Sequence, residues 1–281
     1  MDDYALIDAG GGARLERFGE HVIDRPHGAV FTERRAPDRW AEADLRFDRD
    51  GGWIGSGVVA ALAGWTMAYH GLSMELRPTD AGQVGLFPEH GQELPWLRDQ
   101  VLERGTDGAT VQVLNLFAYT GLTTLALARE GASVTHVDAS RPAVAWARRN
   151  AAANGLEDRP IRWIVDDATA YVDREVRRGR RYDGIVLDPP TYGHGTARSA
   201  WRLDDDLPGL LLACGRLLAP DGFVLLTAHT EGYGPERLHE LIATTIVGGE
   251  RFTGGAGDLD LRSAAGGILT LGAFVKLDAR S

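Results

Sequence analysis

The stretch Asp188-Pro189-Pro190-Thr191-Tyr192 combines a carboxylate, two prolines and an aromatic ring directly after a short apolar run. The carboxylate of Asp188 and nearby carbonyls can accept hydrogen bonds from an amino group. The prolines fix the backbone without offering N–H groups, and the ring of Tyr192 can stack on a flat molecule. The stretch therefore suits a grip on a planar, nitrogen-containing acceptor. The alternative is a loop that merely ends a strand.

Two histidines and a long loop lie near this stretch in the expected fold. His229 follows another expected strand and can accept a proton; the alternative is an ordinary loop histidine. His194 is a second candidate, with a flexible glycine loop as its alternative. The loop from Thr191 to Arg202 is long enough to cover an acceptor. Within it, Trp201 and Arg202 can stack on or anchor the acceptor, although Trp201 can equally fill the core.

The elements that must position these residues follow a regular alternation from residue 110 onward. Short apolar stretches alternate with longer segments of helical pattern, which is typical of an α/β doubly wound sheet with parallel strands at its centre. In such a sheet, ligands bind at the carboxyl ends of the strands, near the point where strand order reverses. The expected strands cover residues 111–116, 132–137, 161–165, 183–187, 222–227 and 268–276, and the expected helices cover 121–130, 140–153, 168–178, 207–218 and 235–245.

The first part of the chain has a different pattern. Its short apolar stretches are broken by Gly, Pro and Asp, which predicts a small β-rich domain. Residues 65–69 and 72–76 flank His70-Gly71, which predicts a tight hairpin, and a second strand pair is expected around Gly10-Gly11-Gly12. The chain is therefore predicted to consist of a β-rich domain, a linker with a helix and an α/β domain, at residues 1–80, 81–108 and 109–281.

Composition narrows the class of protein. The 281 residues are 44% hydrophobic and carry a net charge of −10, unlike the strongly basic proteins that grip a long phosphate backbone. No apolar run is long enough to span a bilayer, and the acidic N-terminus lacks the pattern of a signal peptide. We therefore expect a cytoplasmic protein without membrane contact. The single cysteine, Cys214, excludes an internal disulfide and a thiolate cluster, and no metal is expected.

Three expected strand ends carry residues that suit a nucleoside-containing cofactor. Residues 115–121 form a turn into a helix N-terminus, with one glycine and no lysine, so the turn is neither a dinucleotide cradle nor a P-loop. Asp138, which ends the second strand, suits a ribose diol. Asp167, after the third strand, can accept the amino group of an adenine; helix capping is the alternative for both. Ribose and adenine contacts without a phosphate cradle indicate S-adenosylmethionine (SAM) rather than NAD.

Four segments, taken in order and spacing, resemble the class I SAM-dependent methyltransferases: 115–121, 136–140, 167–168 and 187–190. More narrowly, they are similar to the branch related to bacterial large-subunit ribosomal RNA cytosine-C5 methyltransferases, whose linker also resembles residues 84–90. The resemblance covers roughly residues 84–230. It implies a Rossmann-like, seven-stranded methyltransferase sheet with SAM over the first strand and S-adenosylhomocysteine as the product.

The same resemblance implies a set of cofactor contacts. It places Asn115, Phe117 and Tyr119 along the methionine side and Gly121 at the turn. It also implies that Asp138 holds the ribose, that Asp167 holds the adenine and that Asp188 faces the transferring methyl group. Residues 1–80 resemble the N-terminal portion of uncharacterised relatives rather than a known RNA-binding module.

One departure from that branch bears on the chemistry. Cytosine-C5 methylation needs a cysteine thiolate that adds to the ring, and the cytosine enzymes carry it after the fifth strand. Here that place reads Leu226-Thr227-Ala228-His229-Thr230-Glu231-Gly232. The only cysteine, Cys214, lies on an apolar helical face, where a core position is expected. The basic RNA-binding domain of those enzymes is not recognisable either, so we reject cytosine-C5 chemistry for this chain.

The sequence therefore predicts SAM-dependent methyl transfer, with a nitrogen of a planar acceptor as the target. Asp188, Pro189, Tyr192 and His229 are the expected catalytic residues. An RNA base and a small metabolite are both open as acceptors, because the resemblance favours RNA and the acidic surface favours a small molecule. A non-catalytic SAM-binding protein and a nucleotide-dependent oxidoreductase are less favoured, and the oligomeric state is not predicted.

Overall fold

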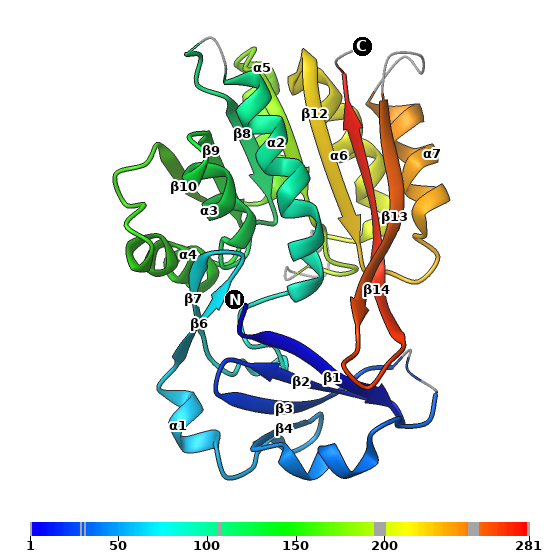
Figure 1. Ribbon diagram of the computed structural model, residues 1–281. Coiled ribbons are helices and arrows are strands. Elements are labelled where there is room, and N and C mark those ends of the chain that lie inside the picture. Colours follow the sequence, from blue (N-terminus) through cyan, green and yellow to red (C-terminus); the bar gives the residue numbers. More distant parts are fainter. Residues whose placement is uncertain are drawn as a thin grey trace. The chain divides into compact units, whose positions relative to one another are not determined.

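The computed structural model describes residues 2–28, 30, 32–105, 108–193, 201–246 and 253–279 of the chain (Figure 1). Its internal contacts separate two compact units: unit 1 holds Met1–Gln92 and Asp260–Thr270, and unit 2 holds Glu93–Leu259 and Leu271–Ser281. Unit 1 thus extends beyond residue 80 and includes a second segment. The reason is hydrogen bonding, because Tyr69 Oη donates to the Pro88 carbonyl and the backbone N–H of Ala264 donates to the carbonyl of Leu6.

Unit 1 is rich in strands, which confirms the expectation for this region. Its elements are β1 (Tyr4–Gly10), β2 (Ala13–Phe18), β3 (His21–Pro26), η1 (Pro37–Glu42), β4 (Leu45–Asp48), β5 (Gly52–Ile54), α1 (Val58–Leu62), β6 (Trp65–Tyr69), β7 (Leu72–Leu76) and most of η2 (Pro88–Glu93). The strands β1 to β5 form one sheet in chain order, in which only β3 and β4 run parallel. The expected β6–β7 hairpin is present, and His70 and Gly71 both have positive φ angles, as its tight turn requires.

Unit 2 is an α/β unit whose elements follow the predicted alternation. They are α2 (Leu94–Arg104), β8 (Gln112–Leu116), α3 (Leu122–Arg129), β9 (Ser133–Asp138), α4 (Arg141–Ala153), β10 (Ile161–Val165), α5 (Ala168–Arg177), β11 (Tyr182–Leu187), α6 (Leu203–Leu217), β12 (Leu218–Ala228), α7 (Pro235–Thr245), β13 (Thr253–Arg262) and β14 (Ile268–Asp278). The ends of β13 and β14 that flank their connection belong to unit 1.

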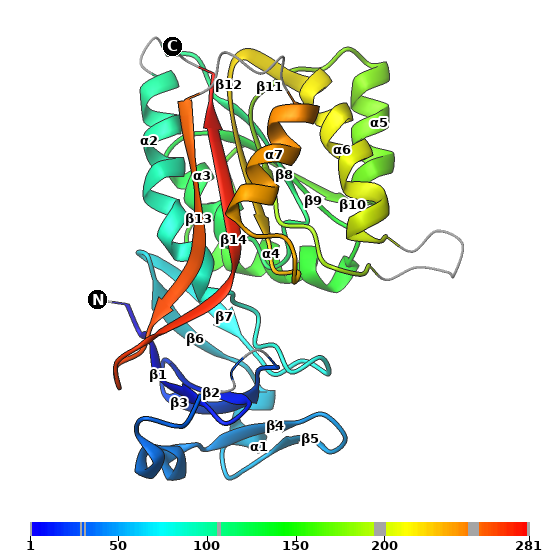
Figure 2. The same ribbon diagram turned by 90° about the vertical axis from the view of Figure 1, so that its right-hand side faces the viewer.

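The seven-stranded sheet has the order β10-β9-β8-β11-β12-β14-β13. Its strands from β10 to β12 run parallel, and β14 pairs antiparallel with β12. Helices α2 to α4 form one contacting group and α5 to α7 another, and the two groups cover opposite faces of the sheet (Figures 1 and 2). The Rossmann-like fold class is confirmed. Strand order reverses between β8 and β11, so a ligand site is expected at the carboxyl ends of these two strands.

The sequence did not predict β13. Its glycine-rich start, Gly254-Gly255-Ala256-Gly257, lacks the alternation that indicates a strand. The structure shows why glycine is needed: a Cβ atom at Gly254 would lie 2.0 Å from the Lys276 carbonyl oxygen, and one at Gly257 would lie 2.9 Å from the ring of Phe274. Glycine in a strand often marks such a close approach. Among the described residues, no helix has the length and apolarity needed to cross a membrane.

Candidate functional site

The turn between β8 and α3 has an unusual backbone conformation. Phe117 and Tyr119 have φ angles of 56° and 48°, and Gly121 has 93°. A positive φ is uncommon for bulky residues and clusters at functional sites. At Gly121 a Cβ atom would lie 3.0 Å from the Cβ of Ala147. Glycine therefore allows α3 to start close to α4, and the strained turn remains compact at the end of β8.

Asp138 holds this turn from the end of β9. Its two carboxylate oxygens accept hydrogen bonds from the backbone N–H groups of Tyr119 and Ser140, each at 2.8 Å. On the other side, Asn150 of α4 donates from Nδ2 to the Thr120 carbonyl at 2.9 Å. Burial raises the pKa of Asp138, and the two backbone donors oppose that rise. The ends of β8 and β9 are thereby tied together, and the ribose role of Asp138 stays a prediction.

A buried polar chain lies beneath the turn. Asn115 donates from Nδ2 to Thr124 Oγ1 at 2.8 Å, and Thr124 Oγ1 lies 2.9 Å from Nδ1 of His136. Burial lowers the pKa of His136 to about 3, so the ring is neutral at ordinary pH. Sequence reasoning assigned no role to Thr124 or His136, since only their depth in the fold reveals one.

Asp167 occupies the start of α5 after β10. Its Oδ1 accepts the backbone N–H of Ala170 at 2.9 Å, so the residue caps the helix. The neighbouring Asp166 pairs with Arg174. The capping alternative is therefore present in the structure, while Asp167 itself is exposed at the sheet edge. Capping uses one carboxylate oxygen and is compatible with the predicted contact to an adenine.

Together, the exits of β8, β9 and β10 form what we call the cofactor half of the site: residues 115–121, 138–140 and 166–168. Its observed features are a strained compact turn, the carboxylates of Asp138 and Asp167, and partly buried aromatic rings at Phe117 and Tyr119. This set fits SAM, which carries a ribose diol, an adenine and an amino acid group and no phosphate. The cofactor contacts predicted for individual residues remain predictions.

Asp188 follows β11, on the other side of the point where strand order reverses. Two side chains converge on its Oδ1: the hydroxyl of Thr227 at 2.5 Å and Nε2 of His229 at 3.1 Å. The other ring nitrogen of His229, Nδ1, lies 2.9 Å from the carbonyl oxygen of Leu271. A carbonyl can only accept, so Nδ1 carries a proton. The protonation of His229 can therefore change only at Nε2, the nitrogen that faces Asp188.

The other predicted residues near the end of β11 differ in how exposed they are to solvent. Pro189 is buried, whereas Tyr192 is 74% exposed and pairs through its backbone with Arg202. Trp201 is 7% exposed, donates from Nε1 to the Pro190 carbonyl at 2.7 Å and packs against Phe117. The core position is therefore correct for Trp201. We call five residues at the exits of β11 and β12 the acceptor half: Asp188, Pro189, Tyr192, Thr227 and His229. Beside it, a hydrogen bond at 2.7 Å between Thr191 and Thr230 also joins the two exits.

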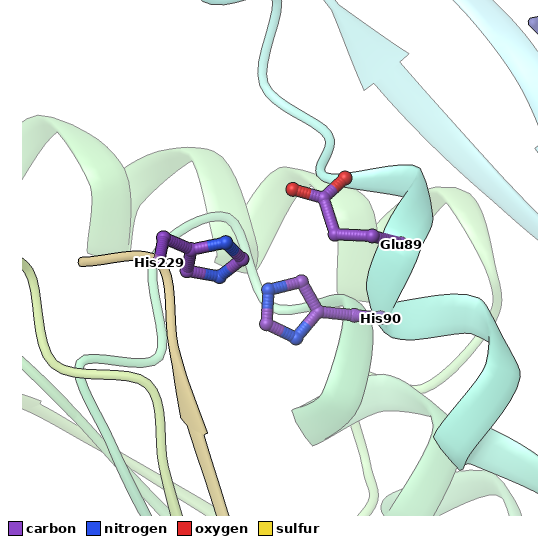
Figure 3. Close-up of side chains that lie close together, drawn as sticks. All are labelled: Glu89, His90 and His229. Atoms are coloured by element: carbon purple, nitrogen blue, oxygen red, sulfur yellow. The ribbon is translucent and has the colours of Figure 1, made fainter. Parts of the chain in front are cut away.

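The other residues considered from the sequence are a histidine of the expected covering loop, the single cysteine and residues near the ends of α5 and β12. His194 and most of the expected covering loop lie outside the described residues. Cys214 is fully buried in α6, and burial raises the pKa of its thiol, as expected of a core cysteine. Two arginines that follow α5, Arg178 and Arg181, donate to Glu175 and to the Arg216 carbonyl, respectively. Figure 3 shows His229 just past β12 in unit 2 and, in unit 1, the side chains of Glu89 and His90 on η2.

A family model and a solved structure that are similar to this chain both carry the description of a SAM-dependent methyltransferase. The sequence model of a family described as S-adenosylmethionine-dependent methyltransferase matches residues 40–251. A solved SAM-dependent methyltransferase from Agrobacterium tumefaciens is 37% identical, with a TM-score of 0.91 over 99% of this chain and 91% of that one. A solved protein from Streptococcus mutans, 18% identical with a TM-score of 0.75 over 98% of this chain and 75% of that one, shares the fold.

Curated relatives are similar over a shorter stretch. The ribosomal RNA large subunit methyltransferase K/L of Magnetococcus marinus is 30% identical over 174 residues, which is 61% of this chain and 23% of that protein. The protein of the same name from Allochromatium vinosum is 32% identical over 190 residues, or 63% of this chain and 24% of that protein. The chain thus spans only about a quarter of the length of these relatives.

Proposed function

Because the chain belongs to the SAM-dependent methyltransferase family, we propose that it transfers the methyl group of SAM to a nitrogen of a planar acceptor such as an RNA base. The observation that carries this proposal is the Asp188 carboxylate, which Thr227 and His229 fix at the end of β11. SAM, when bound, supplies an electrophilic methyl group. The residues of the cofactor half hold it, and those of the acceptor half orient the nitrogen that attacks.

Orientation is the main contribution that this acceptor half can make. A carboxylate at a fixed position accepts a hydrogen bond from the N–H of an amino acceptor and directs its lone pair away from that contact. Holding two reactants in line removes much of the entropic barrier of a bimolecular reaction. The buried ring of Pro189 shapes the same strand exit, and the exposed ring of Tyr192 offers a face on which a planar acceptor can stack.

Proton balance assigns a role to His229. A neutral amino nitrogen that gains a methyl group must lose one proton. Asp188 can take this proton and pass it to Nε2 of His229, at 3.1 Å. Nδ1 keeps its own proton, because it donates to the Leu271 carbonyl. After the transfer the imidazolium has a donor on each nitrogen, and it returns the proton to solvent.

Covalent cytosine chemistry is not supported by this chain. A cysteine thiolate has to attack the ring in that reaction, and the sequence contains a single cysteine. Cys214 is fully buried in an apolar cluster around β11 and β12, and burial raises its pKa. The place after the fifth strand of the sheet holds Thr227 and His229 instead. This difference argues against a cytosine carbon as the acceptor atom and supports the proposed nitrogen.

The alternative function is methylation of a small molecule. The net charge of −10 favours it, as do the aspartates Asp204, Asp205 and Asp206 in the first turn of α6. These acidic groups disfavour a polyanionic partner. The names of the curated relatives favour RNA.

One assay separates the two acceptors. Radiolabelled SAM is incubated with the purified protein and with two pools from a host that lacks the gene, total RNA and a small-molecule extract. Label in one RNA species supports the proposal, and label only in the small-molecule pool supports the alternative. Absence of label from both pools, with SAM binding intact, contradicts both.

A further inference from the structure

Thr227 is a buried hydroxyl in an apolar strand. It follows Phe223-Val224-Leu225-Leu226 in β12, and it is 1% exposed. A buried hydroxyl without a partner is costly, so its partners identify its role. Its Oγ1 lies 2.5 Å from Oδ1 of Asp188 and 3.3 Å from the Leu187 carbonyl oxygen. The hydroxyl has a single proton, and the shorter contact, to the charged acceptor, is the stronger one.

We infer that Thr227 is a positioning residue whose hydroxyl sets the orientation of the Asp188 carboxylate toward the acceptor. This inference rests on the proposed function, in which Asp188 orients the acceptor nitrogen. Thr227 approaches Oδ1 from the adjacent strand, and His229 approaches the same oxygen from the loop that follows. Contacts from two directions to one oxygen restrict the rotation of the carboxylate about its Cβ–Cγ bond, and the Thr227 hydroxyl is the donor of the shorter contact.

The neighbouring contact between Thr191 and Thr230 provides a matched control. It is also a threonine hydroxyl bond between the exits of β11 and β12, at 2.7 Å, and it involves no atom of Asp188. If Thr227 acted only by tying the two exits together, its loss and the loss of the Thr230 hydroxyl should have similar effects. If Thr227 orients Asp188, only the first change should slow methyl transfer.

The kinetic test compares Thr227→Val, Thr227→Ser and Thr230→Val in the full-length protein. The readouts are kcat and the KM for SAM, with total RNA from a host that lacks the gene as methyl acceptor. We expect Thr227→Val to lower kcat about 10–100-fold, because a misplaced catalytic group costs factors of this size, and to leave the KM for SAM within about twofold. Thr227→Ser should restore kcat to within about threefold, and Thr230→Val should resemble the unchanged protein.

A spectroscopic readout keeps the inference testable without turnover. In ¹⁵N-labelled protein, Thr227→Val should shift the Nε2 resonance of His229, because Oδ1 of Asp188, which faces Nε2, loses the Thr227 hydroxyl, whereas Thr230→Val should not. If the unchanged protein methylates neither pool, the proposed function fails and this spectrum alone decides whether Thr227 orients Asp188. Thr227→Ala replaces Thr227→Val if the latter does not fold. An unshifted Nε2 resonance, an undiminished kcat in Thr227→Val, or a Thr227→Ser variant as slow as Thr227→Val would each overturn the inference.

Discussion

The cofactor half and the acceptor half of the site are held by different kinds of contact. In the cofactor half, backbone N–H groups donate to Asp138, and Asn150 donates to a backbone carbonyl. In the acceptor half, the contacts to Asp188 come from two side chains, those of Thr227 and His229. Each hydrogen bond in the first set has a backbone group as one partner, so its loss can alter the path of the chain. A hydrogen bond between two side chains can be removed by one substitution that leaves the backbone in place. Changes in the cofactor half should therefore affect SAM affinity or stability, and changes in the acceptor half should affect turnover.

The sharpest test of this division is Asp188→Ala. We expect methyl transfer to fall by at least about 100-fold, a loss typical of removing one preorganised polar group at a reacting centre. SAM affinity, measured by calorimetry, should stay within about twofold. Asp188→Asn is the matched control, because it keeps the shape and one acceptor oxygen. An active Asp188→Ala enzyme would refute the acceptor role and end the division between the halves.

A change on the other side of the division is Asp138→Ala. Its carboxylate is the predicted partner of the ribose hydroxyls, so its loss should weaken SAM binding by ~1–3 kcal/mol, the typical cost of an unpaired buried group. Calorimetry measures this directly, and Asp173→Ala, on the exposed side of α5, serves as the control. Unchanged SAM affinity in Asp138→Ala would remove the ribose assignment.

The buried His136 beneath the cofactor turn predicts a pH effect on stability. Its pKa is about 3 in the folded protein and about 6.5 in an unfolded chain. Between these values the unfolded state binds a proton that the folded state excludes, so stability is lost as the pH falls from about 6.5 toward 3. From pH 7.5 to pH 5 this contribution amounts to about 2 kcal/mol.

Urea denaturation at pH 7.5 and pH 5 measures the effect. The loss of stability on acidification should be smaller by about that amount in His136→Gln. The exposed His239 on α7 provides the control His239→Gln, which should keep the full pH dependence. Equal acid sensitivity in His136→Gln and in the unchanged protein would show that His136 is not excluded from protonation.

The smallest expected effect is that of Cys214→Ala. This thiol belongs to α6 and is fully buried, and burial raises its pKa. Activity should stay within about twofold, and the free energy of unfolding should fall by about 1 kcal/mol, a typical value for a core substitution. Both are measured on the purified variant. Loss of methyl transfer without loss of folding would reopen covalent chemistry.

The same division explains which parts of the molecule the sequence could predict. Alternating apolar and helical patterns located β10 and α7 at their observed bounds, and Ser140, where the helix over 140–153 was expected to begin, caps α4. Asp138 and Asp188 were found because each stands at the end of an apolar run. Thr227 was not, because its partner lies 39 residues away, and no local pattern links the two. The glycine-rich start of β13 was missed because its strand depends on close packing against β14.

The segment Asp260–Thr270 has a consequence for anyone who wishes to dissect this protein. It belongs to unit 1 although it is continuous with the last two strands of the seven-stranded sheet, and its Ser263 and Ala264 bond to the carbonyls of Ile7 and Leu6. Unit 1 is therefore discontinuous in sequence, because it combines residues 1–92 with the segment Asp260–Thr270. A fragment that starts at Glu93 would keep the connection between β13 and β14 but would lack β1, the strand to which that connection is hydrogen-bonded. Shortening or transplanting unit 1 thus requires two cuts and a redesigned turn between β13 and β14.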